Sequence, residues 1–348
     1  MYEKAKAIVV EKPKHAVVQE IPICPVDAET IVVETKYSAI STGTEMKVWG
    51  GLSGHLGGEL WYPLVPGYEA VGEIVFVGDK VEGFAVGERV MANEVRYYPE
   101  HCHAWGGQCG LIVKNPKTSP SPFDPPAKIP DNVSYQEAVA AYLAAVAKKG
   151  IDKVAPQPDE TVLVIGMGLI GISAVQLAKL NGSRVIAMDI NAKRLALAGK
   201  FTDECIDAHK DDPIAALESL TDGRRADVVI ECSGNPAVVN GLPGYLRDGG
   251  WERDDDGGRI HLQGDYPDPL LISPYQKWFT KNLRLSMTCA IRPGGKEEIL
   301  GLISEGKFDA KTILESDMTQ EMPVDQAQAA YETVLKSRND VFKILLQW

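Results

Sequence analysis

The sequence predicts an α/β protein with two domains, one rich in β-strands and one built on a doubly wound parallel sheet. Three observations carry this prediction. The chain has 348 residues, which at roughly 150 residues per domain suggests two domains. Residues 1–125 contain short strand-like runs separated by glycine and proline turns. From residue 155 onward, strand-like runs alternate with helical ones, which is typical of parallel βαβ units.

The first part of the chain reads as strands joined by turns. Short runs rich in β-branched residues predict strands at 7–10, 30–35, 72–77 and 89–92. A proline-rich stretch then leads to a helix. Ser134 is its expected N-cap and Glu137, three residues on, completes a capping box. Gly150 is the expected end of this helix.

The second part alternates strands and helices. Apolar runs predict strands at 161–165, 184–188, 227–230 and 259–262, and helical patterns cover 169–180 and 192–200. The chain closes with a predicted helix at 324–336 and a predicted strand at 342–346.

Composition excludes several classes of function. Lysine plus arginine number 36 and aspartate plus glutamate 48, a net charge of −12, and without a basic patch such a chain repels nucleic acid. The longest apolar stretch, 138–147, is ten residues and too short to cross a bilayer. The charged N-terminus does not resemble a signal peptide. Six cysteines without a Cys-x-x-Cys pair favour reduced thiols and a cytoplasmic location.

One glycine motif points to a nucleotide. Gly166, Gly168 and Gly171 form G-x-G-x-x-G directly after a predicted strand, and Leu169 and Ile170 open the helix that follows. The first glycine allows a tight turn, the second a close approach of pyrophosphate, and the third close packing of helix on strand. The helix N-terminus offers free N–H groups to phosphate. We therefore expect a dinucleotide site here.

Residues at the carboxyl ends of three later strands complete the expected cofactor site. Asp189 ends the second strand, where a carboxylate can accept both ribose hydroxyls and would repel a 2′-phosphate, which favours NAD over NADP. Arg194 lies five residues on, and an arginine there can accept NADP instead. Ser233 and Gly264 follow two further strands, whose carboxyl ends line the ligand crevice of such sheets.

Several motifs together resemble the medium-chain dehydrogenase/reductase family, the zinc-type alcohol dehydrogenases. They are Pro66–Gly72, Val86–Val90, Lys128–Pro130 and the loop at 166–171. The resemblance implies a GroES-like β-barrel catalytic domain at 1–154, a Rossmann NAD-binding domain at 155–290, and a C-terminal return at 291–348 that completes the first domain. It also implies an oxidoreductase that transfers hydride between an alcohol and a nicotinamide cofactor.

The metal ligands that this resemblance implies are replaced. Ser41 stands where the family has a zinc-binding cysteine, Tyr68 stands where it has a histidine, and the third region, 140–148, lacks a ligand. Hydroxyls are poor zinc ligands, so of the usual set only Glu69 remains and we expect no family-type zinc. The candidates for a different metal site are Glu69, His55, His101, Cys102 and His103.

Chemistry without zinc needs another proton path and another partner for the alkoxide. By position, the resemblance implies a relay through Thr44 and Lys47, with Tyr68 and Glu69 shaping the oxygen site and Glu45 orienting Tyr68. The expected substrate is a polyol, sugar or other bulky secondary alcohol.

The motifs at 38–45, 62–69 and 342–348 resemble the branch that contains hydroxyethyl bacteriochlorophyllide dehydrogenase and altered sugar and polyol dehydrogenases. A zinc-free quinone or enoyl reductase and a non-catalytic nucleotide-binding protein are the alternatives. By family analogy the strand at 283–288 pairs with its copy in a homodimer. Neither nucleic acid nor a membrane is expected as a partner.

Overall fold

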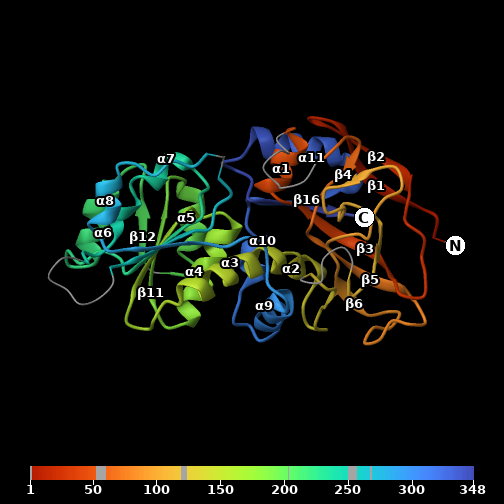
Figure 1. The fold of residues 1–348 in the computed structure, drawn as a ribbon, viewed down its shortest axis with the longest axis horizontal. Coiled ribbons are helices and arrows are strands. Elements are labelled where there is room, and N and C mark those ends of the chain that lie inside the picture. The colour runs from red at the N-terminus through yellow and green to blue at the C-terminus, as the bar shows by residue number, and fades with distance from the viewer. Residues whose placement is uncertain (1, 52–59, 119–123, 203, 250–256, 267–268) are drawn as a thin grey trace. The chain divides into compact units, whose positions relative to one another are not determined.

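The computed structural model describes residues 2–51, 60–118, 124–202, 204–249, 257–266 and 269–348. The chain divides into two compact units (Figure 1). The first comprises Met1–Tyr142 and Ile291–Trp348, and the second Leu143–Ala290. The chain thus returns to its first unit after completing the second.

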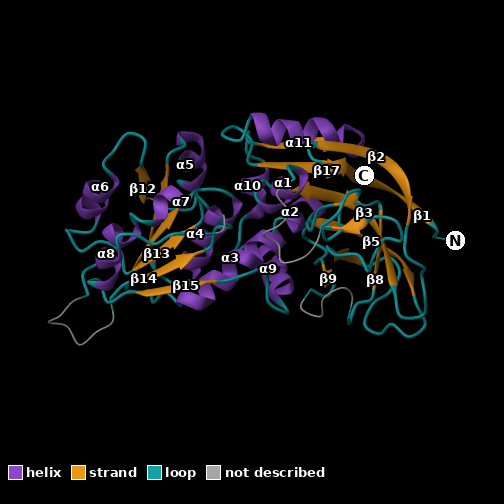
Figure 2. Cartoon of the chain, turned by 45° about the horizontal axis from the view of Figure 1, so that its top comes forward, coloured by secondary structure: helices purple, strands orange, loops and turns teal. Residues whose placement is uncertain are grey.

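The first unit is built from two sheets. A four-stranded sheet has the order β2-β1-β4-β7, and a seven-stranded sheet runs β16-β17-β3-β5-β6-β9 with β8 also paired to β3. The last strand, β17, lies antiparallel to β3, with Ile344 opposite Ile40, so the C-terminal segment completes this sheet (Figure 2). The strands are β1 (Lys4–Lys12), β2 (His15–Pro22), β3 (Ile31–Ile40), β4 (Leu64–Val65), β5 (Ala70–Val77), β6 (Arg89–Met91), β7 (Cys102–His103), β8 (Leu111–Lys114), β9 (Ala127–Lys128), β16 (Thr319–Pro323) and β17 (Lys343–Gln347).

Short helices complete this unit. They are α1 (Thr44–Trp49), α2 (Tyr135–Val139), α9 (Gly295–Ser304), α10 (Ala310–Leu314) and α11 (Ala327–Lys336), the last preceded by a 3-10 turn at Val324–Gln326. The predicted capping box is confirmed, because Ser134 Oγ accepts from the Glu137 N–H and the Glu137 carboxylate accepts from the Ser134 N–H.

The predicted end of the helical segment at Gly150 is wrong. The helix breaks after α2 and resumes as α3 (Ala141–Val154), which passes through Gly150. A Cβ atom at Gly150 would lie 1.9 Å from Gln263 Oε1 and 2.8 Å from His261 Nε2. The glycine therefore allows the helix to approach strand β14 and its following residue closely, a packing role that mimics a stop signal in the sequence.

The second unit holds one six-stranded sheet in which every neighbouring pair is parallel (Figure 2). Its order, β12-β11-β10-β13-β14-β15, is that of a Rossmann fold, with the switch point between β10 and β13. The predicted strands are confirmed to within a residue at their ends. The elements are β10 (Thr161–Ile165), α4 (Leu169–Leu180), β11 (Arg184–Asp189), α5 (Ala192–Ala198), β12 (Glu204–Asp207), α6 (Pro213–Leu220), β13 (Val228–Glu231), α7 (Pro236–Val239), a 3-10 turn (Leu242–Tyr245), β14 (Arg259–Leu262), α8 (Tyr275–Phe279) and β15 (Arg284–Met287).

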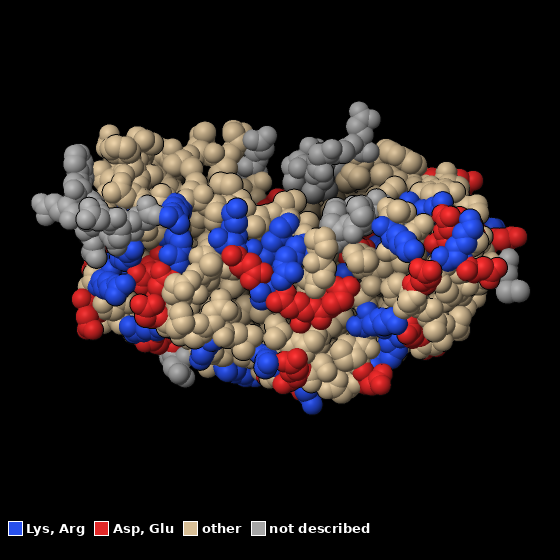
Figure 3. Space-filling view, turned by 60° about the horizontal axis from the view of Figure 1, so that its bottom comes forward, with Lys and Arg blue, Asp and Glu red and all other residues tan. Residues whose placement is uncertain are grey.

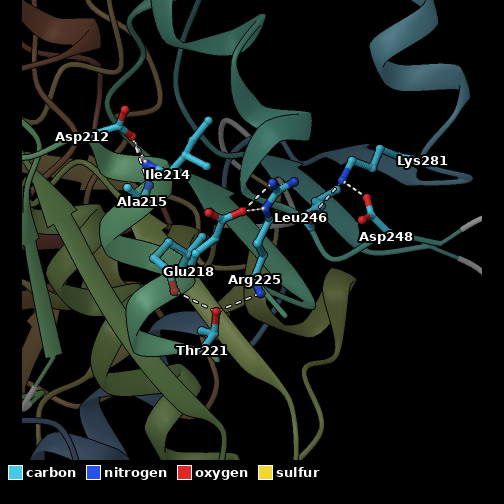
Figure 4. A network of polar contacts seen from close by, with 10 residues as sticks. Asp212, Ile214, Ala215, Glu218, Thr221, Arg225, Leu246, Asp248 and Lys281 are labelled. Carbon is cyan, nitrogen blue, oxygen red and sulfur yellow. Dashed lines mark hydrogen bonds and ion pairs between the residues drawn. The ribbon is translucent and has the colours of Figure 1, made fainter. Parts of the chain in front are cut away.

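Polar cross-links stabilise this unit away from the ends of its strands that carry the glycine loop. Arg225 pairs with Glu218 of α6, its N–H donates to Thr221 Oγ1 at 2.8 Å, and Lys281 joins Asp248 to the Leu246 carbonyl (Figure 4). On the face in Figure 3 basic and acidic side chains are interspersed, so that face carries no field of one sign. Within the described residues, no helix is both long and apolar enough to cross a membrane.

Candidate active site

The glycine loop joins β10 to α4, and its three glycines meet three different steric demands. Gly166 has φ of +90°, and a Cβ there would lie 2.6 Å from Ser233 N. A Cβ at Gly171 would lie 1.8 Å from the Gly166 carbonyl oxygen. At Gly168 a Cβ would meet no described atom within 4 Å. The first and third glycines are thus needed by the protein itself, whereas the second leaves open space at the N-terminus of α4.

This cradle fits the phosphates of a dinucleotide. Gly168 is the N-cap of the twelve-residue α4 and has no capping side chain. The first amides of the helix, at Leu169 and Ile170, have no partner within the helix by its geometry. They present hydrogen-bond donors and the positive end of the helix dipole to an anion. The residues predicted for the pyrophosphate therefore come together at one point.

Asp189 ends β11 beside this loop. Its Oδ2 accepts from Met167 N at 2.5 Å and its Oδ1 from Asn191 N at 2.8 Å. The carboxylate therefore bridges the glycine loop and the start of α5, and each oxygen keeps a further lone pair for a ribose hydroxyl. Arg194 is half-buried in the first turn of α5, where Asn191 Oδ1 accepts from its N–H.

Ser233 and Gly264 lie on neighbouring loops. Gly166 contacts the loop after β13 at Ser233, and a Cβ on Gly264 would lie 2.5 Å from Gly234 Cα. The three loops therefore touch in series along one edge of the sheet. Ser233 is exposed, while Gly264 is half-buried.

Three hydroxyl groups meet in the first unit. The Tyr68 hydroxyl donates to Ser41 Oγ and is also hydrogen-bonded to the Thr44 side chain. The Tyr68 ring is buried against Trp105, edge to face at 4.8 Å between centroids, and against Tyr142 at 5.1 Å. Burial raises the pKa of the Tyr68 phenol far above its ordinary value, and the neighbouring Glu69 adds to this. The hydroxyl is therefore a hydrogen-bond donor at neutral pH.

Glu69 lies in a fully buried ion pair. Its Oε1 accepts from Lys343 Nζ at 2.5 Å, and both side chains are at most 1% exposed. Its Oε2 has no hydrogen-bond partner among the described residues. Burial raises the pKa of Glu69 to about 7, although the Lys343 ammonium opposes this rise. Lys47 is half-buried on α1, three residues after Thr44 and so on the same helix face.

Glu45 does not contact Tyr68 in the way that the sequence suggested. Its Oε2 accepts from Ser41 N at 2.9 Å, and its Oε1 accepts from Gln108 Nε2 at 3.0 Å and from the Tyr331 hydroxyl at 2.6 Å. Within the described chain its link to Tyr68 therefore passes through Ser41. Sequence reasoning missed Gln108, Tyr331 and Lys343, because each joins the site from a distant segment.

The residues at the positions where the family resemblance implies zinc ligands lack the chemistry that zinc prefers. Ser41, Tyr68 and Tyr142, which lies in the third ligand region, are neutral hydroxyls in mutual contact or ring packing. Burial also raises the pKa of Tyr142, so neither phenol is an anionic ligand, whereas zinc prefers thiolate, imidazole and carboxylate. Across the described residues no three His, Cys, Asp or Glu side chains are placed to hold a metal ion. That set includes His101, Cys102 and His103, while His55 lies outside the described residues.

Comparisons with known proteins cover both units. The family "Alcohol dehydrogenase GroES-like domain" matches residues 27–116, and the family "Zinc-binding dehydrogenase" matches residues 170–251. A sorbitol dehydrogenase from Halalkalibacterium halodurans is 27% identical over 95% of both chains. A Probable D-xylulose reductase A from Aspergillus clavatus is 27% identical over 88% of this chain and 87% of its own.

Solved structures share the fold along the whole chain. A short chain alcohol dehydrogenase from E. coli CFT073, in complex with NADH, superposes with a TM-score of 0.81 at 23% identity, covering 99% of this chain and 100% of its own. A zinc-binding dehydrogenase from Sinorhizobium meliloti 1021, bound to NADP, gives a TM-score of 0.81 at 20% identity over 99% of both chains. Together with the motifs and the Rossmann strand order, these matches show that the chain belongs to the medium-chain dehydrogenase/reductase family of alcohol dehydrogenase-like proteins.

Proposed function

We propose that this alcohol oxidoreductase uses NAD(H) to interconvert a secondary alcohol and its ketone without a catalytic zinc ion. The expected substrate is a polyol, a sugar or another bulky carbinol. The observation that carries the proposal is the hydroxyl cluster of Ser41, Thr44 and Tyr68, which occupies the position where the family resemblance expects metal ligands. Relatives named as sorbitol dehydrogenase and D-xylulose reductase support a polyhydroxylated substrate.

Asp189 supports NAD as the cofactor. A carboxylate beside the glycine loop can accept hydrogen bonds from the adenosine ribose and repels a 2′-phosphate. The related structures include one with NADH and one with NADP, so the preference rests on this side chain. Arg194, whose N–H is held by Asn191 at the start of α5, is the residue that could offset it.

The chemistry divides between the cofactor and the protein. A bound NAD⁺ would supply the hydride acceptor for the carbinol carbon. The alcohol oxygen meanwhile develops negative charge and loses its proton. The Tyr68 hydroxyl, kept protonated by burial, would donate a hydrogen bond to that oxygen. Thr44 and Lys47, on one face of α1, would carry the proton away.

The ion pair of Glu69 and Lys343 would fix the buried backbone beneath this site. A buried ion pair whose second carboxylate oxygen has no partner in the described chain is sensitive to loss of either member, since an uncompensated buried charge costs roughly 3–5 kcal/mol. We assign Glu69 the role of fixing the segment that carries Tyr68, its neighbour in sequence. The Lys343 partner comes from the last strand, which ties the C-terminal return to the site.

A metal analysis combined with a substrate panel tests the proposal. The protein is purified without added zinc, its metal content is measured, and reduction of NAD⁺ is followed with a panel of polyols before and after treatment with a chelator. We expect far less than one zinc per chain and turnover that survives the chelator. Stoichiometric zinc, or activity lost to the chelator and restored by zinc, would refute the zinc-free mechanism. Consumption of NADPH with quinones would favour the reductase alternative, and binding of NAD without turnover on any alcohol would favour a non-catalytic protein.

We also propose a homodimer in the cytoplasm. Strand β15 lies at the edge of the parallel sheet, and Met287 on it is 57% exposed. An open strand edge with an apolar side chain favours pairing with a second copy. The six cysteines, which lack the spacing of a disulfide framework, favour a reducing compartment.

A further inference from the structure

One buried carboxylate contacts two of the loops at the proposed cofactor site. Glu231 is the last residue of β13 and its side chain is fully buried. Its Oε1 accepts from Ser233 N at 2.8 Å and from the Ser233 hydroxyl. Its Oε2 accepts from Gly234 N at 3.2 Å and from the Tyr266 hydroxyl. Glu231 therefore joins its own loop to the loop after β14.

The backbones of these loops also lie close to one another. Gly234 has φ of +66°, and its Cα is the atom that a Cβ on Gly264 would meet at 2.5 Å. On its other side the same loop contacts Gly166 through Ser233. The loop after β13 thus lies between the glycine loop and the loop after β14. A shift of Tyr266 would consequently displace the loop backbone that is expected to contact the cofactor.

The positions of Glu231 and Tyr266 in the sheet indicate which half of a dinucleotide would lie beside them. In a doubly wound sheet the two halves of the cofactor lie on opposite sides of the switch point. Asp189, at the end of β11, is on the side expected to hold the adenosine ribose. Glu231 and Tyr266 follow β13 and β14, on the other side of the switch point, where the nicotinamide half must then lie.

We propose that Glu231 and Tyr266 are positioning residues for the nicotinamide half of the cofactor. The inference rests on the proposed function, since it requires that the Rossmann unit binds NAD(H). The carboxylate receives its hydrogen bonds from four donors in two loops, so it orders both loops before the cofactor arrives. Preorganisation of this kind increases affinity by reducing the ordering needed on binding. Burial raises the pKa of Glu231, and the Ser233 and Gly234 donors oppose that rise.

The test compares two ligands on the full-length protein. NADH carries the nicotinamide, whereas ADP-ribose carries only the adenosine, pyrophosphate and ribose portion. Binding of NADH is measured by fluorescence titration and binding of ADP-ribose by calorimetry, for the wild type, Tyr266→Phe and Glu231→Gln. Tyr245→Phe is the matched control, because Tyr245 lies in the same unit but outside these loops.

We expect Tyr266→Phe to raise the Kd for NADH by about tenfold, which corresponds to roughly 1.4 kcal/mol, and to change the Kd for ADP-ribose by less than about twofold. Glu231→Gln should give the same pattern, and Tyr245→Phe should leave both constants unchanged. Equal weakening of both ligands would overturn the inference, because the pair would then support the whole site. Wild-type affinity of Tyr266→Phe for NADH would also overturn it. A wild-type protein that binds neither ligand would refute the proposed function, and with it this inference.

Discussion

Two glycines of the glycine loop are expected to serve different purposes, cofactor binding at Gly168 and helix packing at Gly171. The variants Gly168→Ala and Gly171→Ala can test these two purposes separately. A methyl group at Gly168 would enter space that no described protein atom approaches within 4 Å. The same group at Gly171 would lie 1.8 Å from the carbonyl oxygen of Gly166. The first variant should therefore lose cofactor affinity with little loss of stability, and the second should lose stability.

The magnitudes follow from these contacts. An ordinary contact between carbon and a neighbouring heavy atom is about 3.5 Å, so at Gly171 helix and loop would have to separate by more than an ångström. Overpacking of this kind costs about 1–3 kcal/mol. The better helix propensity of alanine returns up to ~1 kcal/mol. A net loss of about 1–2 kcal/mol lowers the Tm by roughly 2–8 °C for a unit of this size. At Gly168, an N-cap, the stability cost should stay below ~1 kcal/mol.

Thermal melting and NADH titration of both variants provide the assay. For Gly168→Ala we expect a Tm close to the wild type and a Kd for NADH raised at least about tenfold, since the methyl group would occupy the place of the pyrophosphate. Gly301→Ala is the control, because Gly301 lies inside α9, where a Cβ meets no described atom within 4 Å apart from its own stretch of helix backbone. It should melt slightly higher and bind NADH normally. Normal NADH affinity in Gly168→Ala, or an unchanged Tm in Gly171→Ala, would refute the reasoning.

Four further outcomes are expected. Tyr68→Phe should lower kcat about 10–100-fold while the Kd for NADH stays constant, and unchanged turnover would remove the phenol from the mechanism. Asp189→Ser should raise the Kd for NADH and lower that for NADPH in direct titrations, whereas a constant ratio would show that another group selects the cofactor. Burial lowers the pKa of His261 from 6.5 to about 4, so the folded state resists protonation of this side chain. The free energy of unfolding should therefore fall by up to about 3 kcal/mol between pH 6.5 and pH 4. In denaturant titrations, His261→Gln should reduce that loss, whereas His209→Gln, at an exposed position, should leave it unchanged. Met287→Asp should convert a dimer to monomers in light-scattering measurements, and a wild-type monomer would contradict the proposed edge pairing.

The second unit could be predicted from sequence because its signals are local. Strands buried on both faces of a parallel sheet are continuous apolar runs, as in the run from Thr161 to Ile165, and they are visible without knowledge of their neighbours. The glycine loop is equally local, since its turn, its open cradle and its helix contact fall within six residues. The β11 strand ending at Asp189 then followed from the same alternation.

Predictions failed where a residue serves a distant neighbour. Gly150 has the sequence signature of a helix end, yet its role is set by Gln263 and His261, more than a hundred residues later. Helix α1 was not predicted, because six residues give too little periodicity to detect. A one-residue break between α2 and α3 leaves no signal in the apolar pattern either.

In the candidate site, too, residues in local motifs could be predicted, whereas their distant partners could not. The positions of Ser41, Thr44, Tyr68 and Glu69 could be predicted from motifs. Their partners could not, because Lys343 is 274 residues from Glu69 and Tyr331 is 286 residues from Glu45. Such pairs arise only when the C-terminal return closes the sheet beside β3. Glu231 was overlooked for a different reason, since a carboxylate that ends an apolar strand looks like an ordinary boundary until its two loops are seen together.

The surroundings of Tyr68 argue for an adapted site rather than a damaged one. The tyrosine ring packs against Trp105 and Tyr142, and its hydroxyl is hydrogen-bonded to the side chains of Ser41 and Thr44. The charge balance points the same way. Glu69 is paired with Lys343 at 2.5 Å, so whenever this carboxyl is ionised its negative charge is matched by a buried cation. A divalent ion at this place would add positive charge beside that ammonium and would find neutral hydroxyls as its other ligands. The packing, the hydrogen bonds and the charges thus agree with the zinc-free mechanism that we propose, in which a protonated phenol would stand beside the substrate oxygen.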